Sequence, residues 1–357
     1  MAVAWIGNRD ALVQHAVEHA AELLAASRCP VISIDTDIHG TRAAIALAER
    51  IGAAYDHPDD AVARETAAFT DRGGMFVSPG EARRRADLVV LVGDLPAYSL
   101  EFVSELAETP PDLSGANSRS FFLADGNSSG APPFNNEVPV TRLSCGGTDL
   151  SGTVAALRAQ LAGRRVARPV ENAEHLSEVL GQARFTVFLC SGAGLDDLTL
   201  EMVQGLAADL NRKVRASILL MPASENGWGS ALVSTWTTGF PLRTSFSQAS
   251  PQFDPWRCNV GRMIEEGEAD LHLWIGAGTE RPPSLNGAMK LIALTKTEQP
   301  VESAAITIPI GEPGADHDAV FFSARTGTFA AEAARSPSQM PGAAVIINSI
   351  MEQLPAG

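Results

Sequence analysis

Cysteine is scarce in this chain of 357 residues, and its four copies lie far apart, at Cys29, Cys145, Cys190 and Cys258. No two of them form a Cys-x-x-Cys pair, the spacing at which cysteines commonly bind zinc or an iron–sulfur cluster. The wide spacing also argues against the disulfide framework of a small secreted protein. We therefore expect buried thiols in a reducing compartment, and a cytoplasmic protein.

Basic residues and long apolar runs are also in short supply. The chain has 27 Lys and Arg against 42 Asp and Glu, which gives a formal net charge of −15. Nucleic-acid binding needs clustered cations that neutralise phosphates, so this balance excludes a nucleic-acid partner. No apolar run approaches the roughly 20 residues that cross a bilayer, and the N-terminus lacks an export signal. We expect neither nucleic acid nor membrane as a partner.

Short apolar runs, by contrast, are frequent. Leu88–Val92 is apolar at every position, so both of its faces should be buried, as in a central parallel strand covered by helices. Leu271–Ile275 has similar flanks, with Ala-Asp before it and Gly276 after it. One hydrophobic core stops growing at roughly 250–300 residues. The sequence therefore predicts an α/β protein with two Rossmann-like parallel-sheet domains.

One glycine-rich turn has the location of a dinucleotide-binding turn. Ser191-Gly-Ala-Gly194 follows a buried strand and precedes a helix, but an aspartate, Asp197, stands where the third glycine of that motif would be. Asp196 and Asp197 would also repel a phosphate at the start of the helix. A tight strand-to-helix turn is the better interpretation. The sequence has neither a P-loop nor a Gly-x-Ser-x-Gly nucleophile motif.

Two short acidic segments contain metal-ligand residue types, Asp316–Asp318 and Asp35–His39. Adjacent residues on one loop rarely point at the same ion, and neither segment has a second cluster at a ligand-like spacing. Solvated loops are the favoured interpretation. The sequence thus predicts no metal ligand and no catalytic residue.

The segment 222–259 shows little helical periodicity and has an unusual composition rich in Ser, Thr, Pro and Trp. Its sequence resembles the B subunit of formylmethanofuran dehydrogenase, a member of the molybdopterin oxidoreductases, and the resemblance extends over most of the chain. Proteins of that superfamily hold a pterin-bound tungsten or molybdenum between two α/β domains. The stretches that carry the resemblance are Ala43–Gly52, Ala86–Pro96, Ser224–Trp228, Thr235–Pro241 and Phe246–Pro255.

The resemblance implies that the second domain is inserted in the first. Residues 1–55 and 166–357 would form one discontinuous α/β domain, and residues 56–165 would form the inserted one. We therefore expect Phe185–Leu189 to share a sheet with Val31–Ile34.

The departures from the family concern its metal site. The chain starts directly at the first α/β helix, without the iron–sulfur domain. The family's metal-ligating Cys-His-Gly-Pro corresponds to Ala61–Glu65, which has no thiol, and His57 lies several residues too early. The resemblance therefore implies that no metal, pterin or other cofactor is bound. The residues left from the family's cofactor loop would be Asn226, Gly227, Trp228, Trp236 and Gly239.

A bacterial variant of the family fits these departures, the formyltransferase/hydrolase complex of one-carbon metabolism and formaldehyde oxidation. Such a complex transfers a formyl group from tetrahydromethanopterin to a furan-type carrier, methylofuran, and then releases formate by hydrolysis. The resemblance implies a non-redox scaffold subunit, with the carrier and the hydrolytic metal held by partner subunits. These partners would be hydrolase, formyltransferase and glutamate-synthase-like subunits.

Two further interpretations stay open from the sequence. The chain could be an independent oxidoreductase domain that binds a nucleotide or thiamine-type cofactor in the crevice beyond Gly93 and Gly192. The aromatic residues of 222–259 could contact a partner subunit or could be core residues beneath a long loop. They are Trp228, Trp236, Phe240, Phe246, Phe253 and Trp256.

Overall fold

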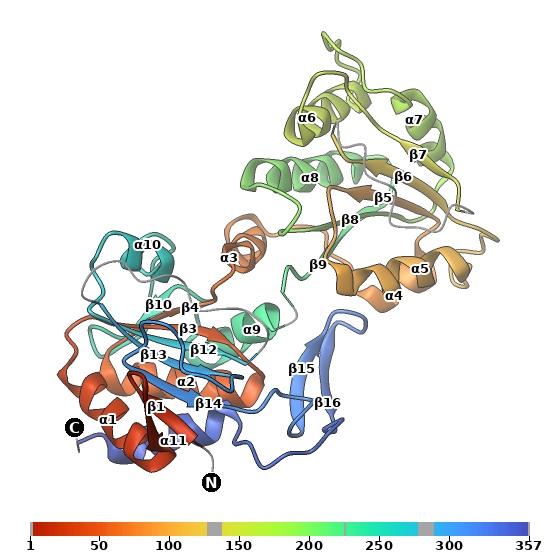
Figure 1. The fold of residues 1–357 in the computed structure, drawn as a ribbon. Coiled ribbons are helices and arrows are strands. Elements are labelled where there is room, and N and C mark those ends of the chain that lie inside the picture. The colour runs from red at the N-terminus through yellow and green to blue at the C-terminus, as the bar shows by residue number, and fades with distance from the viewer. Residues whose placement is uncertain (1–2, 127–137, 225, 278–288, 356–357) are drawn as a thin grey trace. The chain divides into compact units, whose positions relative to one another are not determined.

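The computed structural model describes residues 3–126, 138–224, 226–277 and 289–355, and within them the chain divides into two compact units (Figure 1). Each unit has its own sheet and its own hydrophobic core. Unit 1 comprises Met1–Ala63, Asn226–Phe322 and Phe329–Gly357, and unit 2 comprises Arg64–Glu225 and Ser323–Thr328.

In the described part of unit 1, nine strands form a mixed sheet in the order β11-β10-β4-β3-β12-β13-β14-β1-β2. The five strands in the middle, β4 to β14 in this order, are parallel, and antiparallel strands extend both edges. The strand bounds are β1 Val3–Ile6, β2 Arg9–Leu12, β3 Pro30–Asp35, β4 Ala54–Asp56, β10 Thr244–Ser245, β11 Gln252–Phe253, β12 Leu271–Gly276, β13 Lys290–Thr295 and β14 Ile306–Pro309. A separate hairpin pairs β15 (Ala319–Ser323) with β16 (Thr328–Glu332).

Helices cover both faces of this sheet. Helices α1 (Val13–Ala26), α2 (Ile38–Ile51), α9 (Gly227–Thr238) and α11 (Ala343–Gln353) lie on one face, and α10 (Val260–Glu265) lies on the other (Figure 1). The strand pleat explains the division, because successive side chains point to opposite faces. In β3, Ile32 and Ile34 join the core under α1, α2 and α11, whereas Val31 joins the core under α10.

Unit 2 is built on five described parallel strands in the order β7-β6-β5-β8-β9. The prediction for Leu88–Val92 is confirmed, because this segment is β5, the central strand, and it is buried throughout. The other strands are β6 Ser120–Ala124, β7 Val140–Arg142, β8 Thr186–Ser191 and β9 Ala216–Met221. Helices α4 (Pro79–Arg85) and α5 (Leu100–Glu108) pack on one face, and α6 (Leu150–Leu161), α7 (Ala173–Gln182) and α8 (Asp197–Leu210) pack on the other. Helix α3 (Asp60–Ala67), extended by the π-helical turn Ala68–Arg72, leads the chain from unit 1 into unit 2.

Side-chain caps begin some of the helices. Asp37 begins α2 and accepts a hydrogen bond from the Gly40 N–H at 2.9 Å, and Gly52 ends the helix in the left-handed conformation, with φ of 69°. Asp149 and Asp196 cap α6 and α8 in the same way as Asp37 caps α2. No helix in the described part of the chain is both long enough and apolar enough to cross a membrane.

Several sequence-based expectations are wrong. The chain does not start directly at a helix, because the strands β1 and β2 precede α1. Phe185–Leu189 does not share a sheet with Val31–Ile34: it overlaps β8, which pairs with β5 in the other sheet. Unit 2 therefore extends through β8 and β9 to Glu225 rather than ending at residue 165. A further error concerns 222–259, which contains the helix α9 and is not a continuous loop.

Candidate functional site

Each sheet has a crevice where neighbouring strands lead the chain in opposite directions, the usual ligand position in open α/β folds. In unit 2 this point lies between β5 and β8, because β5 is followed by β6 on one side and β8 by β9 on the other. Gly93 follows β5 and Gly192 follows β8. These are the two positions that the sequence indicated for a nucleotide or thiamine-type ligand.

The carboxylate of Glu65 accepts hydrogen bonds from the polar groups of this crevice. One oxygen, Oε1, accepts hydrogen bonds from the Gly192 N–H at 2.7 Å and the Ser191 hydroxyl at 3.4 Å. The other, Oε2, accepts from the Ala223 N–H at 3.0 Å. Glu65 is only 1% exposed, so its carboxyl group is held by backbone donors away from water. A phosphate would need the same donors.

The backbone closes the rest of the crevice. A Cβ atom added to Gly194 would lie 2.1 Å from the Asp94 carbonyl oxygen, and one added to Gly93 would lie 2.7 Å from the Gly194 carbonyl oxygen. The turns after β5 and β8 therefore pack directly against each other. At the start of α8, the Asp196 carboxylate accepts from the Thr199 N–H at 2.6 Å. The tight-turn interpretation of Ser191–Gly194 thus fits the geometry better than a dinucleotide site.

Arg64, the residue before Glu65, binds the same turn. The Arg64 guanidinium donates to the Gly192 carbonyl oxygen at 2.7 Å and to the Asp197 carboxylate at 2.7 Å. Two consecutive residues of α3 therefore bind the N–H and the C=O of the same glycine. Both lie in the stretch Ala61–Glu65 that the family resemblance aligned with the metal-ligating segment.

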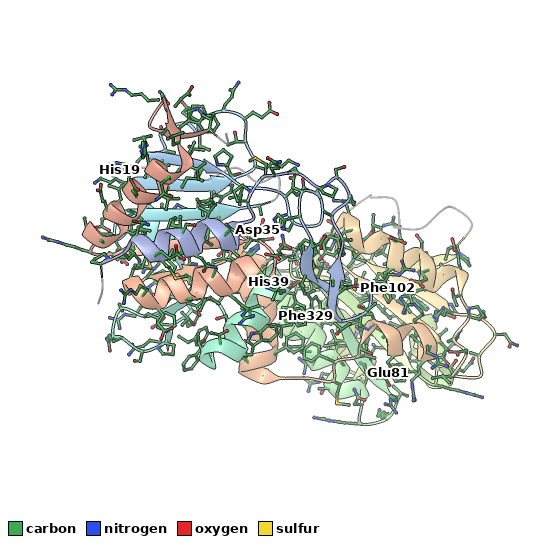
Figure 2. All side chains as sticks on the ribbon, turned by 90° about the horizontal axis from the view of Figure 1, so that it is seen from below. His19, Asp35, His39, Glu81, Phe102 and Phe329 are labelled. Atoms are coloured by element: carbon green, nitrogen blue, oxygen red, sulfur yellow. The ribbon has the colours of Figure 1, made fainter. Side chains whose placement is uncertain are left out.

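The corresponding crevice of unit 1 lies between β3 and β12, and it contains a buried acid–histidine pair. Asp35, labelled in Figure 2, is the last residue of β3. Its Oδ1 accepts a hydrogen bond from the Asn226 amide at 2.9 Å and lies 3.7 Å from Nε2 of His57. The His57 side chain is 1% exposed, so the pair is enclosed by protein.

Opposite charges at this crevice shift the pKa values of its groups. Burial opposes ionisation of Asp35, but hydrogen bonding and attraction to His57 outweigh it and lower the Asp35 pKa. Burial likewise opposes protonation of His57, and Asp35 outweighs it and raises the His57 pKa. The Asp59 N–H donates to Nδ1 of His57 at 3.0 Å, which favours the tautomer with its proton on Nε2, facing Asp35. The raised pKa favours the doubly protonated ring, whereas the bond from Asp59 requires an unprotonated Nδ1. The same bond fixes the orientation of the ring.

A second buried carboxylate lies one residue before His57. Asp56 is bound by the Arg243 guanidinium at 3.1 Å and by the His57 N–H at 2.8 Å. Burial is the largest influence on Asp56, and it raises the pKa to about 6 in spite of these cationic and polar partners. Arg243 also donates to Asp60 and to the Pro255 carbonyl oxygen, so it ties β4 to the segment after β11.

The five residues expected to remain from a cofactor loop are distributed along α9. Asn226 precedes the helix and reaches Asp35, and Gly227 is buried at the first helical position. Trp228 packs edge-on against Phe322, with ring centroids 6.5 Å apart. Trp236, on the last turn, is 54% exposed, and Gly239 ends the helix with φ of 84°. The structure thus brings Asn226 into the crevice but not Trp236 or Gly239. Glu225, inside the Ser224–Trp228 stretch, lies outside the described residues.

The cysteines and the two acidic segments do not assemble a metal site among the described residues. The expectation of a solvated loop at Asp35–His39 is wrong, because Asp35 ends β3, Asp37 caps α2 and both are buried. All four cysteines are unpaired, and no group of three or more His, Cys, Asp or Glu side chains is placed to hold an ion in the part of the chain described. In Asp316–Asp318, the Asp316 carboxylate accepts from the Glu312 N–H at 2.8 Å, and His317 Nδ1 binds the Asp318 carbonyl oxygen.

Glu65 is the residue that the sequence-based reasoning missed. The donors that it binds come from Ser191, Gly192 and Ala223, which are more than 120 residues away in the sequence. No local motif marks such a contact. The only sequence signal is an acidic residue in an otherwise alanine-rich apolar helix face.

Comparison with known proteins places the whole chain. No protein-family model matches the sequence. The chain is 31% identical to the B subunit of the formyltransferase/hydrolase complex Fhc of Methylorubrum extorquens, over 98% of each protein. It is 24% identical to the B subunit of a tungsten-containing formylmethanofuran dehydrogenase of Methanocaldococcus jannaschii, over 73% of the chain and 63% of that protein.

A solved structure gives the same relationship. The fold matches a chain of the crystal structure of the Methylorubrum extorquens formyltransferase/hydrolase complex FhcABCD with methylofuran, with a TM-score of 0.88 and 29% identity over 98% of both chains. The similarity in sequence and in structure therefore runs from end to end. The chain belongs to the family of formyltransferase/hydrolase complex B subunits, which is related to the B subunits of formylmethanofuran dehydrogenases.

Proposed function

We propose that this chain is the B subunit of a formyltransferase/hydrolase complex and that it serves there as a structural, non-redox subunit. The observation that carries the proposal is the full-length similarity to the Methylorubrum extorquens protein, with 98% of both chains aligned and a TM-score of 0.88. Retention of the complete fold of a complex subunit supports a place for this chain in a complex of the same kind.

The non-redox part of the proposal is supported by Glu65. Its carboxylate takes the backbone donors of the unit 2 crevice, and the adjacent turns close on each other at Gly93 and Gly194. One thiol of the chain is also a poor candidate for a metal ligand. Cys190 is fully buried, and burial raises its pKa far above the usual range for a thiol, which disfavours the thiolate form that binds metals.

Chemistry in the proposed complex is assigned to the other subunits. The furan-type formyl carrier and the hydrolytic metal would be held by hydrolase and formyltransferase subunits, with a glutamate-synthase-like subunit as a further partner. The overall reaction, formyl transfer followed by release of formate, needs no electron transfer. We assign the chain to the cytoplasm, in agreement with its unpaired cysteines.

Two structural details belong to the same proposal. We propose that unit 2 is a true domain inserted in unit 1, which the division of the chain into two contact units supports. We also propose that part of 222–259 contacts a partner subunit. Trp236, Phe240 and Trp256 support this, with 54%, 38% and 67% of their surfaces exposed, whereas Phe246 is a core residue and is only 4% exposed.

Affinity purification tests the proposal directly. The chain carrying an affinity tag, expressed together with the other subunits of the complex, should retain the formyltransferase and hydrolase subunits in equal amounts. A chain that elutes alone and monodisperse under the same conditions would contradict the proposal. The tag is best placed away from α9, for example at the N-terminus.

The same purified protein distinguishes the proposed function from the alternative, an independent oxidoreductase that binds a nucleotide or a thiamine-type cofactor. Absorbance at roughly 300–450 nm detects flavin and nicotinamide cofactors. Mass spectrometry of the supernatant after denaturation detects any cofactor that the protein releases. We expect none. A stoichiometric nucleotide or thiamine derivative would favour the alternative, which the filled crevice at Glu65 disfavours.

A further inference from the structure

A hollow on unit 1 runs along α2, and we name it the α2 groove. It has a volume of about 610 Å³. Helix α2 forms its floor, and α9 and α11, which pack on either side of α2, form its walls. His39, labelled in Figure 2, lies at the end of the floor where α2 begins. The exposed floor residues are His39, Arg42, Ala46 and Glu49.

The floor residues are one face of a helix. His39, Arg42, Ala46 and Glu49 follow each other at spacings of three and four residues, so they form one row along α2. The opposite face of α2, which includes Leu47, is buried in the core of unit 1. Ala46 has the shortest side chain of the exposed row, which deepens the groove at its middle.

The two charged residues of the floor have no partner in the described part of the chain. Arg42 and Glu49 are both exposed, and neither forms a hydrogen bond or an ion pair there. The positions three and four residues from each of them hold no residue of opposite charge, so the helix cannot pair them internally. Arg50, next to Glu49, differs because it donates to the Pro355 carbonyl oxygen at 2.6 Å.

An exposed tryptophan completes one wall. Trp236 is 54% exposed, and its ring packs edge-on against Phe329 with centroids 5.1 Å apart. Because Phe329 already restricts the ring, binding a partner would cost little further side-chain entropy. Preordered, exposed aromatic residues of this kind are enriched at the energetically dominant positions of protein interfaces.

We propose that the α2 groove receives a helix of another subunit. This helix presents a carboxylate to Arg42 and, two turns further along, a basic side chain to Glu49, with apolar side chains against Ala46 and Trp236. The spacing follows from the floor itself, because seven residues of a helix rise about 10.5 Å. A second helix that lies along the row can match both charges with residues at positions i and i+7.

A second copy of this chain is a poorer occupant. Antiparallel α2 helices from two copies would also pair Arg42 with Glu49, but in each copy α2 is the floor of a hollow between two other helices. A twofold interface places the same surface of both copies face to face. Two hollows that face each other would leave a cavity between the copies. The proposal therefore names a protruding helix of a different subunit. It rests on the proposed membership in a complex and adds the place and the chemistry of one contact.

Three variants test the groove by different means, and each changes an exposed side chain, so the fold is retained. Ala46→Trp fills the groove, Arg42→Glu reverses one charge, and Trp236→Ala removes the aromatic wall. His15→Trp, on the exposed face of α1, is the control for Ala46→Trp, and Arg9→Glu, on the edge strand β2, is the control for Arg42→Glu. Neither control residue lines the groove.

The measurement is the dissociation constant between the chain and the complex of the remaining subunits. Each groove variant should raise it about tenfold or more, whereas both controls should leave it within about twofold of the unaltered chain. Groove variants that bind as tightly as the unaltered chain and the two controls would overturn the groove proposal. A failure of the unaltered chain to bind would instead contradict the proposed function, so the two failures are distinguishable.

A photo-crosslinking amino acid at position 46 identifies the occupant. The expected product joins the chain to a helical peptide of another subunit that carries an acidic and a basic residue seven positions apart. A product that joins two copies of this chain would replace the proposed partner by a second copy. A peptide from another subunit without this charge pair would overturn the proposed chemistry.

Discussion

The two crevices of the molecule lie at equivalent points of their sheets but balance charge in different ways. In unit 2 the Glu65 carboxylate is bound by the backbone N–H groups of Gly192 and Ala223. In unit 1 the Asp35 carboxylate faces two side chains, the amide of Asn226 and the imidazole of His57. Backbone donors do not titrate, whereas histidine does. Unit 1 should therefore respond to pH through an acid–histidine pair, and removal of the Glu65 carboxylate is the most direct test of the unit 2 crevice.

The tryptophans make the two units separately observable. All five of them, Trp5, Trp228, Trp236, Trp256 and Trp274, belong to unit 1. Tryptophan fluorescence therefore follows unit 1, whereas far-ultraviolet circular dichroism follows both units. A change confined to unit 2 should shift the dichroism transition more than the fluorescence transition.

The largest effect is expected from Glu65→Ala. The substitution leaves the N–H groups of Gly192 and Ala223 buried without acceptors and opens a cavity, so unit 2 should lose about 4 kcal/mol of stability. Urea unfolding followed by both probes should show this loss in dichroism. Glu18→Ala, on the exposed face of α1, is the control. Equal stability of Glu65→Ala and the control would show that the carboxylate does not hold the crevice.

The same variant also reports whether the emptied crevice binds anions. Removal of the carboxylate frees the N–H groups of Gly192 and Ala223 as donors for inorganic phosphate or sulfate. Phosphate should therefore raise the unfolding midpoint of Glu65→Ala more than that of the unaltered chain. An equal increase in both would mean that the crevice stays closed to anions without Glu65.

The next effect in size is the pH dependence of unit 1 through Asp56. Burial raises the Asp56 pKa from 3.8 to about 6, so the folded state binds the proton more tightly than the unfolded state. The stability that this provides is present below pH 3.8 and is lost as pH rises to about 6, by about 3 kcal/mol. Asp35, whose pKa is lowered, acts with the opposite sign and below pH 3.8.

Urea midpoints from tryptophan fluorescence between pH 4 and pH 6.5 measure this effect. The buried His272, whose pKa burial lowers to about 4, acts with the opposite sign in this interval. The unaltered chain should therefore show little net change, whereas the stability of Asp56→Asn should rise with pH. Parallel pH profiles for the two proteins would refute the assignment of this dependence to Asp56.

A smaller effect is expected from Asp35→Asn. The neutral amide still reaches Asn226 but cannot attract the His57 ring as a carboxylate does, so unit 1 should lose about 2 kcal/mol. The fluorescence transition should shift while the transition of unit 2, seen by dichroism, stays in place. If both transitions shift together by the same amount, the two crevices are not independent.

The smallest effect on stability is expected outside both crevices, from Trp236→Ala. Because the ring is 54% exposed, the unfolding free energy should change by less than about 1 kcal/mol. Hydrogen exchange should nevertheless show that 227–238 is better protected in the complex than in the isolated chain. Equal protection in both states would mean that α9 is not at a subunit contact.

The central strand of unit 2 was predictable from sequence because its cause is local. Five consecutive apolar residues at Leu88–Val92 require burial on both faces, and β5 has that environment. The pairing of β8 was not predictable in this way. A fully buried strand such as Thr186–Ser191 fits the middle of either sheet, and its composition does not specify its neighbour.

Helix α9 was missed because tertiary contacts override its weak local preference. Gly, Ser, Thr and Trp make up most of Gly227–Thr238, and these residues favour helices less than Ala or Leu. The structure supplies buried hydrogen bonds instead. The Ser230 hydroxyl meets that of Thr41 at 3.1 Å, and the Ser234 hydroxyl meets that of Tyr55 at 2.8 Å. Sequence periodicity does not reveal contacts between residues so distant in the chain. The contacts of Glu65 could not be predicted for the same reason.

Native mass spectrometry of the complex, combined with elemental analysis, is the decisive test of a structural, non-redox role. When the complex dissociates in the gas phase, this chain should be released at the 37.6 kDa of its sequence, with no added pterin mass. Tungsten and molybdenum should be absent from the fraction that contains it. One tungsten or molybdenum per chain, with a matching increase in its mass, would contradict that role.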